Sequence, residues 1–205
     1  MSSLAIIDYG VGNLRSLEKA FAATGTQAVV SHDAYVLSEA KALVLPGVGA
    51  FGACMKALSE RGFDRLVVER VAEGTPLLGV CVGMQLLFEE SEEFGRTPGL
   101  GLLSGKVQRF VGDLPVPHVG WNQVHQTRAH PLLSAIDDNS FFYFVHSYYC
   151  ATDEPEVVLG KTDYITRYAS VVAHRNISGV QFHPEKSQVT GLKLLSNFAQ
   201  LSDKL

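Results

Sequence analysis

An apolar run near the middle of the chain ends in a glycine-flanked turn around a cysteine. Residues 77–85 are Leu-Leu-Gly-Val-Cys-Val-Gly-Met-Gln, which puts Cys81 between Gly79 and Gly83. A sharp strand-to-helix turn crowds the backbone, so the residues two before and two after its centre must be small. The segment therefore predicts a nucleophile elbow, in which Cys81 stands above a sheet and at the start of a helix.

A cysteine in such a turn is suited to nucleophilic chemistry. The positive end of a helix and its free N–H groups stabilise a thiolate, and the N–H of Val82 can donate to an oxyanion. Cys54 and Cys150 lack flanking glycines and a strand-to-helix turn, so we expect them to be buried and inert. Gln85 lies one helical turn after Cys81 and faces the same side, where its amide could hold a polar substrate. A solvated helix glutamine is the alternative.

The order of apolar and amphipathic segments predicts the fold class. In the first half, strands are expected at residues 4–8, 27–31, 42–46 and 76–80, and helices at 13–23, 52–59, 63–72 and from about residue 82. This alternation implies parallel strands with helices on both faces. Aromatic and β-branched strands then follow at 107–110, 141–149, 157–161, 164–175 and 178–182, before a helix at 190–200. We expect one α/β domain over residues 1–205, with a mixed, mostly parallel sheet that is flanked by helices and antiparallel toward one edge.

Composition excludes several classes of function. The net charge of −4 does not favour a nucleic-acid partner. No apolar run approaches the ~20 residues of a membrane span, and the N-terminus lacks the basic start of a signal peptide. The three cysteines show no CxxC or Cys/His spacing for a metal. We expect a cytoplasmic protein with no metal or other cofactor.

One of the seven histidines is placed to assist a thiol nucleophile. His183 ends an expected strand and is followed by Pro184 and Glu185. Residues two apart in an extended segment point the same way, and Pro184 is expected to hold this segment extended. His183 and Glu185 can then face one site, with the carboxylate orienting the ring. A polar loop is the alternative for this tripeptide taken alone.

A glycine-bracketed loop follows the strand expected at residues 42–46. Gly47 and Gly49 flank Val48 and permit backbone conformations that can aim an N–H at an oxyanion. A phosphate cradle is the alternative, but no Lys-Ser/Thr pair follows as in a P-loop. The earlier Gly10-Val11-Gly12 lacks the full dinucleotide fingerprint.

Together these segments resemble the triad-type, class I glutamine amidotransferases, which have a flavodoxin-like fold. The resemblance implies that Cys81 attacks the side-chain amide of glutamine and releases ammonia, that His183 is the acid and base, and that Glu185 orients it. It also implies that the N–H of Val48 turns toward the oxyanion when a partner is activated. The glutamine pocket would be lined by Gly49, Gln85, His146, Ser147 and Tyr148.

Within the family, the chain resembles the branch that serves histidine biosynthesis. The likeness is carried by residues 8–14, 45–51, 117–122, 144–148 and 183–187. It implies a separate (β/α)8-barrel cyclase subunit, which uses the ammonia to form imidazole glycerol phosphate and an aminoimidazole carboxamide ribotide. We expect its contacts around the catalytic mouth, at Asn13, Pro117, Val119, Trp121, Tyr143 and Lys186. A core position for Trp121 and a solvated Lys186 are the alternatives.

Three other hypotheses remain at this stage. The same chemistry could feed another synthase, such as an anthranilate- or nucleotide-forming enzyme. The chain could be a non-catalytic binding module that keeps the pocket. A cysteine peptidase or thiol-stress protein on a related fold would leave Gln85 and the His-Pro-Glu segment unexplained.

Overall fold

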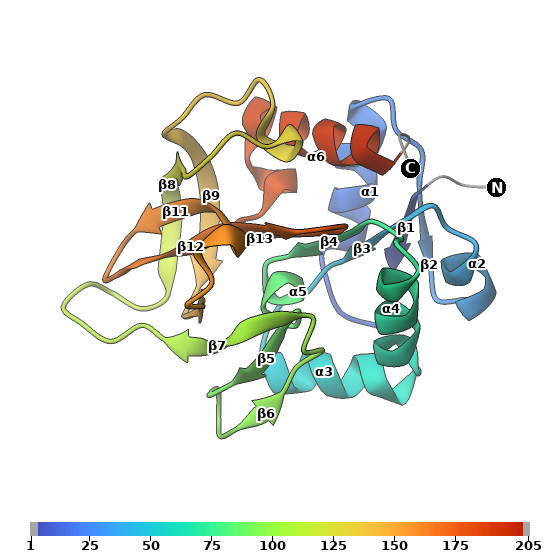
Figure 1. The fold of residues 1–205 in the computed structure, drawn as a ribbon, viewed down its shortest axis with the longest axis horizontal. Coiled ribbons are helices and arrows are strands. Elements are labelled where there is room, and N and C mark those ends of the chain that lie inside the picture. Colours follow the sequence, from blue (N-terminus) through green and yellow to red (C-terminus); the bar gives the residue numbers. More distant parts are fainter. Residues whose placement is uncertain (1–3, 203–205) are drawn as a thin grey trace.

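A mixed sheet runs through the part of the chain that the computed structural model describes, residues 4–202 (Figure 1). Its parallel half has the order β2-β1-β3-β4-β13. These strands are β1 (Leu4–Ile7), β2 (Ala28–Ser31), β3 (Ala42–Leu45), β4 (Leu77–Val80) and β13 (Ile177–Val180). Every residue of β1, β3, β4 and β13 is buried, as expected for parallel strands covered on both faces.

Helices cover the two faces of this parallel half. In Figure 1, α1 (Leu14–Ala23) and α6 (Gln188–Ser202) lie above the sheet, and α3 (Phe51–Glu60) and α4 (Phe63–Ala72) lie below it. Two shorter helices are α2 (Ala34–Ser38) and α5 (Val82–Gln85). Among residues 4–202, no helix has the length and apolar character needed to cross a membrane.

The other half of the sheet is largely antiparallel. Beyond β13 come β12 (Arg167–His174), β10 (Tyr148–Ala151), β7 (Leu103–Arg109), β5 (Phe88–Ser91) and β6 (Thr97–Pro98). A branch pairs β12 with β11 (Val158–Asp163), then β8 (His118–Gln126) and β9 (Ser140–His146). Short 3-10 helices lie at Pro131–Leu133, Pro155–Val157 and Pro184–Lys186. The predicted α/β class is confirmed, and so is a mixed sheet that is flanked by helices, parallel through β2-β1-β3-β4-β13 and antiparallel toward one edge.

Several predicted elements differ from the structure. The helix expected after the elbow is a single turn, because the carbonyls of Leu86 and Leu87 accept hydrogen bonds from the N–H groups of residues 100, 102 and 103 instead of continuing a helix. The strand expected at 141–149 is two strands, since the chain leaves β8 after His146 and pairs with β7 from Tyr148. Strand β8 was not predicted, because polar residues and Gly120 interrupt its apolar pattern.

Candidate active site

Cys81 lies in the sharp turn between β4 and α5. Its backbone has φ 57° and ψ −115°, which is strained for a residue with a side chain. A Cβ on Gly83 would lie 1.9 Å from the Leu45 carbonyl oxygen, and one on Gly79 would lie 2.7 Å from the Gly83 oxygen. Neither position can hold a side chain without movement of the backbone. The predicted sharp turn from a strand to a helix around Cys81 is confirmed.

A cavity of about 330 Å³ opens above the elbow. It lies where β3, β4 and β13 end, the usual place for a ligand in a parallel α/β sheet. Its walls bring together Cys81, His183 and all the residues predicted for oxyanion and glutamine binding. The full lining is Val48, Gly49, Cys81, Val82, Gln85, Glu93, Pro117, Val145, His146, Ser147, Tyr148 and His183.

His183 and Glu185 form a buried pair beside Cys81. His183 Nδ1 lies 2.9 Å from Glu185 Oε1, and both side chains are almost fully buried. The prediction of an extended segment here is wrong after His183, because Pro184–Lys186 is a turn of 3-10 helix. Proline suits the first position of a helical turn. The turn nevertheless brings the Glu185 carboxylate back to the imidazole ring. Ser187 stabilises the turn by donating from Oγ to the His183 carbonyl at 2.6 Å.

The electrostatics of the pair favour a charged imidazole. Burial lowers the pKa of His183, but its hydrogen bonds and charge interactions with Cys81 and Glu185 outweigh burial and raise that pKa to about 10. Burial raises the pKa of Glu185, but His183 and Asn13 outweigh it and leave that pKa below its usual range. Cys81 and His183 both line the cavity. The arrangement therefore suits a thiolate–imidazolium pair held by a carboxylate.

Asn13 contacts this pair from the start of α1. Its Nδ2 donates to Glu185 Oε1 at 3.1 Å. Although Asn13 is the N-cap residue, its side chain makes no capping hydrogen bond to the helix. The amide that sequence placed at a partner surface is therefore directed at the carboxylate.

The N–H of Val82, which was predicted to be free for an oxyanion, is bonded to the predicted oxyanion loop, residues 47–49. Val82 N–H donates to the Gly47 carbonyl at 3.3 Å. On either side, the Pro46 carbonyl accepts from the Tyr9 hydroxyl at 2.6 Å, and the Val48 carbonyl accepts from Cys54 Sγ at 3.4 Å. In this conformation the N–H of Val82 donates to the Gly47 carbonyl and is not free to donate to an oxyanion.

Gln85 is buried rather than solvated. Its Nε2 donates to the Tyr148 carbonyl at 3.1 Å and to Gln181 Oε1 at 3.0 Å. Both hydrogens of the amide are thus used within the protein, and only its oxygen is left for a ligand. Gln181 Nε2 in turn lies 3.9 Å from Cys81 Sγ.

Sequence reasoning missed Glu93, the acidic residue in the cavity lining. Its Oε2 accepts the Phe51 N–H at 2.5 Å, which fixes the carboxylate at the start of α3. Glu93 ends the segment Glu89-Glu90-Ser91-Glu92-Glu93, and a run of charges of this kind is typical of a solvated surface. No local pattern distinguishes the one carboxylate that turns inward.

The residues predicted for a partner surface gather beside the cavity. The ring centroids of Trp121 and Tyr143 are 6.0 Å apart, and Lys186 Nζ lies 5.8 Å from the Tyr143 ring. Val119 and Trp121 are 56% and 45% exposed, so a core position for Trp121 is wrong. Pro117 is at the cavity itself.

The remaining cysteines are buried and free, and burial raises the pKa of both Cys54 and Cys150. Within residues 4–202, no group of three or more histidine, cysteine or acidic side chains is arranged to hold a metal ion.

Comparison with known families gives a match over most of the chain. The family described as glutamine amidotransferase class-I matches residues 5–201. Three curated relatives are named imidazole glycerol phosphate synthase subunit HisH. The one from Nitrosomonas europaea is 49% identical over 97% of this chain and 98% of its own. Those from Nitrosococcus oceani and Sulfurimonas denitrificans are 51% and 48% identical, over 97% and 96% of this chain and 97% of their own.

Solved structures agree on the fold. The crystal structure of a glutamine amidotransferase aligns with a TM-score of 0.79 at 22% identity, covering 98% of this chain and 100% of that one. The structure of PurLQS from Thermotoga maritima aligns with a TM-score of 0.75 at 16% identity, covering 98% and 99%.

Proposed function

The chain belongs to the class I glutamine amidotransferase family, and from this membership we propose that it is the glutamine-hydrolysing subunit of an imidazole glycerol phosphate synthase. Cys81, His183 and Glu185 form its catalytic triad. The observation that best supports this proposal is the strained turn that places Cys81 in the wall of the cavity. His183 lines the same cavity, and its Nδ1 lies 2.9 Å from Glu185 Oε1. The names of the relatives favour the histidine branch over another synthase, a binding module or a peptidase.

The triad carries out hydrolysis in two steps. The thiolate of Cys81 attacks the side-chain amide carbon of glutamine, and the C–N bond breaks as His183 gives its proton to the departing ammonia. A thioester remains. Water then attacks this thioester while His183 takes its proton, the C–S bond breaks, and glutamate and the starting cysteine are released. The raised pKa of His183 suits the first step, because the ring already carries the proton that ammonia needs.

The cavity is suited to free glutamine. An α-ammonium group needs an anionic partner when it leaves water, and Glu93 supplies a carboxylate in the lining. Gly49, Gln85, His146, Ser147 and Tyr148 enclose the rest of the substrate. For Gln85, the free amide oxygen is the group that meets the ligand, since its nitrogen is already bound.

Activity requires a change in the oxyanion loop. The Gly47 carbonyl must leave the N–H of Val82, and the Gly47–Val48 peptide must turn so that the N–H of Val48 replaces it. Two donors then face the oxyanion, and a carbonyl oxygen no longer repels it. Gly47, whose ψ changes when this peptide rotates, has no side chain to resist the change, and the flanking Gly49, with φ 91°, lets the loop adjust. In the conformation described here, hydrolysis is held low until a partner favours the rotated peptide.

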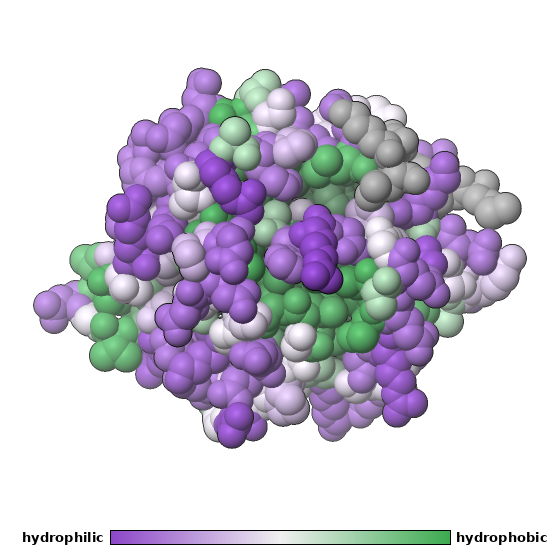
Figure 2. Space-filling view, viewed as in Figure 1, coloured by the Kyte–Doolittle hydropathy of each residue, from purple (hydrophilic) through white to green (hydrophobic). Residues whose placement is uncertain are grey.

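The partner is a separate cyclase subunit that consumes the ammonia. It docks over a group beside the cavity made of the exposed Val119, Trp121 and Lys186 and the half-buried Tyr143. Figure 2 shows further apolar surface at the left edge of the molecule, over the loop between β7 and β8, where Val111 is 84% exposed. A docked partner would also shield ammonia from protonation by water.

The test is a glutaminase assay with and without the cyclase subunit and its nucleotide ligand. We expect low hydrolysis by the chain alone and a strong increase in the complex. Cys81→Ser should lower hydrolysis by at least about 10³-fold and keep partner binding, whereas Cys150→Ala should retain activity. Full hydrolysis by Cys81→Ser would refute the triad. Stimulation only by another synthase would move the chain to a different branch, and a Cys81 that no glutamine-like electrophile labels would indicate a binding module.

A further inference from the structure

Three buried side chains join strand β8 to the wall of the cavity. The Tyr168 hydroxyl lies 3.1 Å from His146 Nε2 and 3.4 Å from His118 Nδ1. His118 and His146 are opposite each other on the paired strands β8 and β9. His146 lines the cavity. The Tyr168 hydroxyl therefore connects an inner histidine to an outer one.

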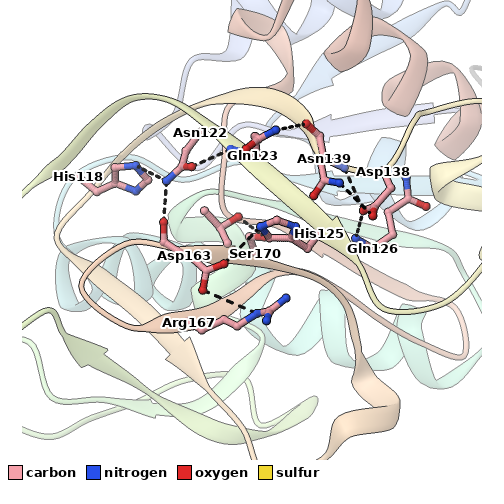
Figure 3. Close-up of polar contacts among 11 residues, drawn as sticks. His118, Asn122, Gln123, His125, Gln126, Asp138, Asn139, Asp163, Arg167 and Ser170 are labelled. Atoms are coloured by element: carbon pink, nitrogen blue, oxygen red, sulfur yellow. Dashed lines mark hydrogen bonds and ion pairs between the residues drawn. The ribbon is translucent and has the colours of Figure 1, made fainter.

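The contacts of His118, the outer histidine, show which of its ring nitrogens donates and which accepts (Figure 3). Asn122 Nδ2 donates to the Asp163 carbonyl at 2.9 Å, and Asn122 Oδ1 accepts from Gln123 N–H at 2.8 Å, which sets the orientation of the amide. The same Nδ2 lies 3.3 Å from His118 Nε2. His118 Nε2 must therefore accept, and the proton of the neutral ring is on Nδ1, which donates to Tyr168.

The inner end agrees with this direction. His146 Nδ1 lies 2.8 Å from the Tyr148 carbonyl, which can only accept, so Nδ1 carries the proton. His146 Nε2 then accepts from the Tyr168 hydroxyl. The Tyr148 carbonyl also accepts from Gln85 Nε2, and both Tyr148 and Gln85 line the cavity. The chain of hydrogen bonds ends in the wall that encloses the substrate.

Both imidazoles are neutral at physiological pH. Burial lowers the pKa of His118 to about 4 and, as the largest of several influences, lowers the pKa of His146 to about 3. A neutral ring has one donor and one acceptor, and here each is used. Linked hydrogen bonds in a buried site strengthen one another, so the chain holds His146 more firmly than a single contact would.

Strand β8 presents its other face to solvent. Side chains alternate along a strand, so His118 and Asn122 point inward while Val119 and Trp121 point outward. The outward pair belongs to the surface proposed for the cyclase. The proposed cyclase surface and the chain of hydrogen bonds thus lie on opposite faces of the same strand, β8.

We propose that Tyr168 is a positioning residue for the glutamine pocket, whose hydroxyl holds His146 and the adjoining Tyr148 carbonyl in the substrate-binding arrangement and ties that wall to β8. This inference rests on the proposed function. Tyr168 is outside the cavity lining, so its hydroxyl acts on substrate binding more than on bond breaking.

The test compares glutaminase kinetics of Tyr168→Phe with the wild type, both in the complex with the cyclase. The phenyl ring keeps the packing but leaves His146 Nε2 and His118 Nδ1 unpaired. We expect the KM for glutamine to rise about tenfold and kcat to stay within about twofold. Tyr149→Phe is the matched control, since Tyr149 lies in the same aromatic cluster but its hydroxyl donates to Gln108 Oε1. An unchanged KM in Tyr168→Phe would overturn the proposal.

A second measurement separates binding from general damage. The rate at which Cys81 is labelled by the glutamine analogue 6-diazo-5-oxo-norleucine is compared with its rate of alkylation by iodoacetamide. In Tyr168→Phe, and more weakly in Asn122→Ala, the half-saturating concentration of the analogue should rise while the iodoacetamide rate is unchanged. Equal slowing of both reagents would overturn the positioning role. Absence of labelling by the analogue in the wild type would overturn the proposed function itself.

Discussion

Asn13, at the start of α1, donates to the same Glu185 oxygen that faces the imidazole of His183. The contacts measure 3.1 and 2.9 Å, and they link the N-terminal helix to a pair near the other end of the chain. A carboxylate that accepts two such donors is fixed in orientation and stays ionised. Asn13 therefore supports Glu185, the residue proposed to orient the catalytic base, in addition to any contact it makes with a partner.

Replacement of Asn13 should reduce turnover. We expect Asn13→Ala to lower kcat about tenfold, the cost of one hydrogen bond to a charged group, and to leave the KM for glutamine unchanged. Asn13→Asp should lower kcat further, because a second carboxylate raises the pKa of Glu185. Steady-state kinetics of the complex provide the measurement. If both variants kept wild-type kcat and only bound the cyclase more weakly, Asn13 would be a partner contact, as its sequence position suggested.

The elbow glycines should tolerate no side chain. Gly83→Ala places a methyl group 1.9 Å from the Leu45 carbonyl, so we expect a loss of several kcal/mol of stability, or no folded protein, as for an overpacked core. The control is Gly52→Ala on helix α3, where the nearest atom is 3.6 Å away and stability should hold or rise by a few tenths of a kcal/mol. Urea denaturation of both variants decides the matter; equal stabilities would show that the elbow can relax.

The elbow was predictable because its sequence pattern is local. Gly79, Cys81 and Gly83 lie in five consecutive residues, and a Cβ on Gly79 would meet Gly83 within the same turn, although the contact that excludes a side chain from Gly83 comes from Leu45 of β3. The parallel half of the sheet was predictable for a similar reason, since strands buried on both faces are continuous apolar runs.

What sequence missed depends on contacts between distant segments. Glu93 enters the cavity because its carboxylate binds the backbone of Phe51, and nothing in its own neighbourhood marks it. The pairing of β8 with β9 places His118 beside His146, and the polar residues that make this contact also conceal the strand. The closed state of Val82 could not be inferred, because it depends on the rotation of one peptide in a loop from another strand.

The His183–Glu185 pair should make stability depend on pH. The folded-state pKa of Glu185 is lowered, so its contribution is present above its unfolded pKa of about 4.3 and is lost as pH falls through the folded value. The folded-state pKa of His183 is raised to about 10, so its contribution is complete below about pH 6.5 and is lost as pH rises toward the folded value. The pair therefore stabilises the fold most between about pH 4.3 and 6.5.

Glu185→Gln measures that contribution. We expect the free energy of unfolding to fall by about 2 kcal/mol relative to wild type near pH 6 and the difference to shrink toward pH 9. Urea denaturation across this range gives the curve, and a Cys81→Ser background removes the part that the thiolate contributes to the pKa of His183. A difference that did not vary with pH would mean that the pair is not ionised in the folded protein.

Trp121 should anchor the cyclase. It is the single tryptophan of the chain, it is about half exposed, and Tyr143 packs against it beside the cavity. Aromatic residues at the centre of an interface often contribute 2 kcal/mol or more, so we expect Trp121→Ala to weaken cyclase binding roughly 30-fold. Isothermal titration calorimetry of the two subunits provides the measurement.

Tyr35→Ala is the control for this effect. Tyr35 is 71% exposed and lies on α2, at the opposite end of the molecule from β8 (Figure 1). Its loss removes a similar apolar area from a surface that the cyclase should not touch, so affinity should be unchanged. Should Tyr35→Ala weaken binding while Trp121→Ala does not, the partner surface lies away from the cavity. Ammonia would then have to cross open solvent, where it is protonated, and direct transfer between the subunits would lose its physical basis.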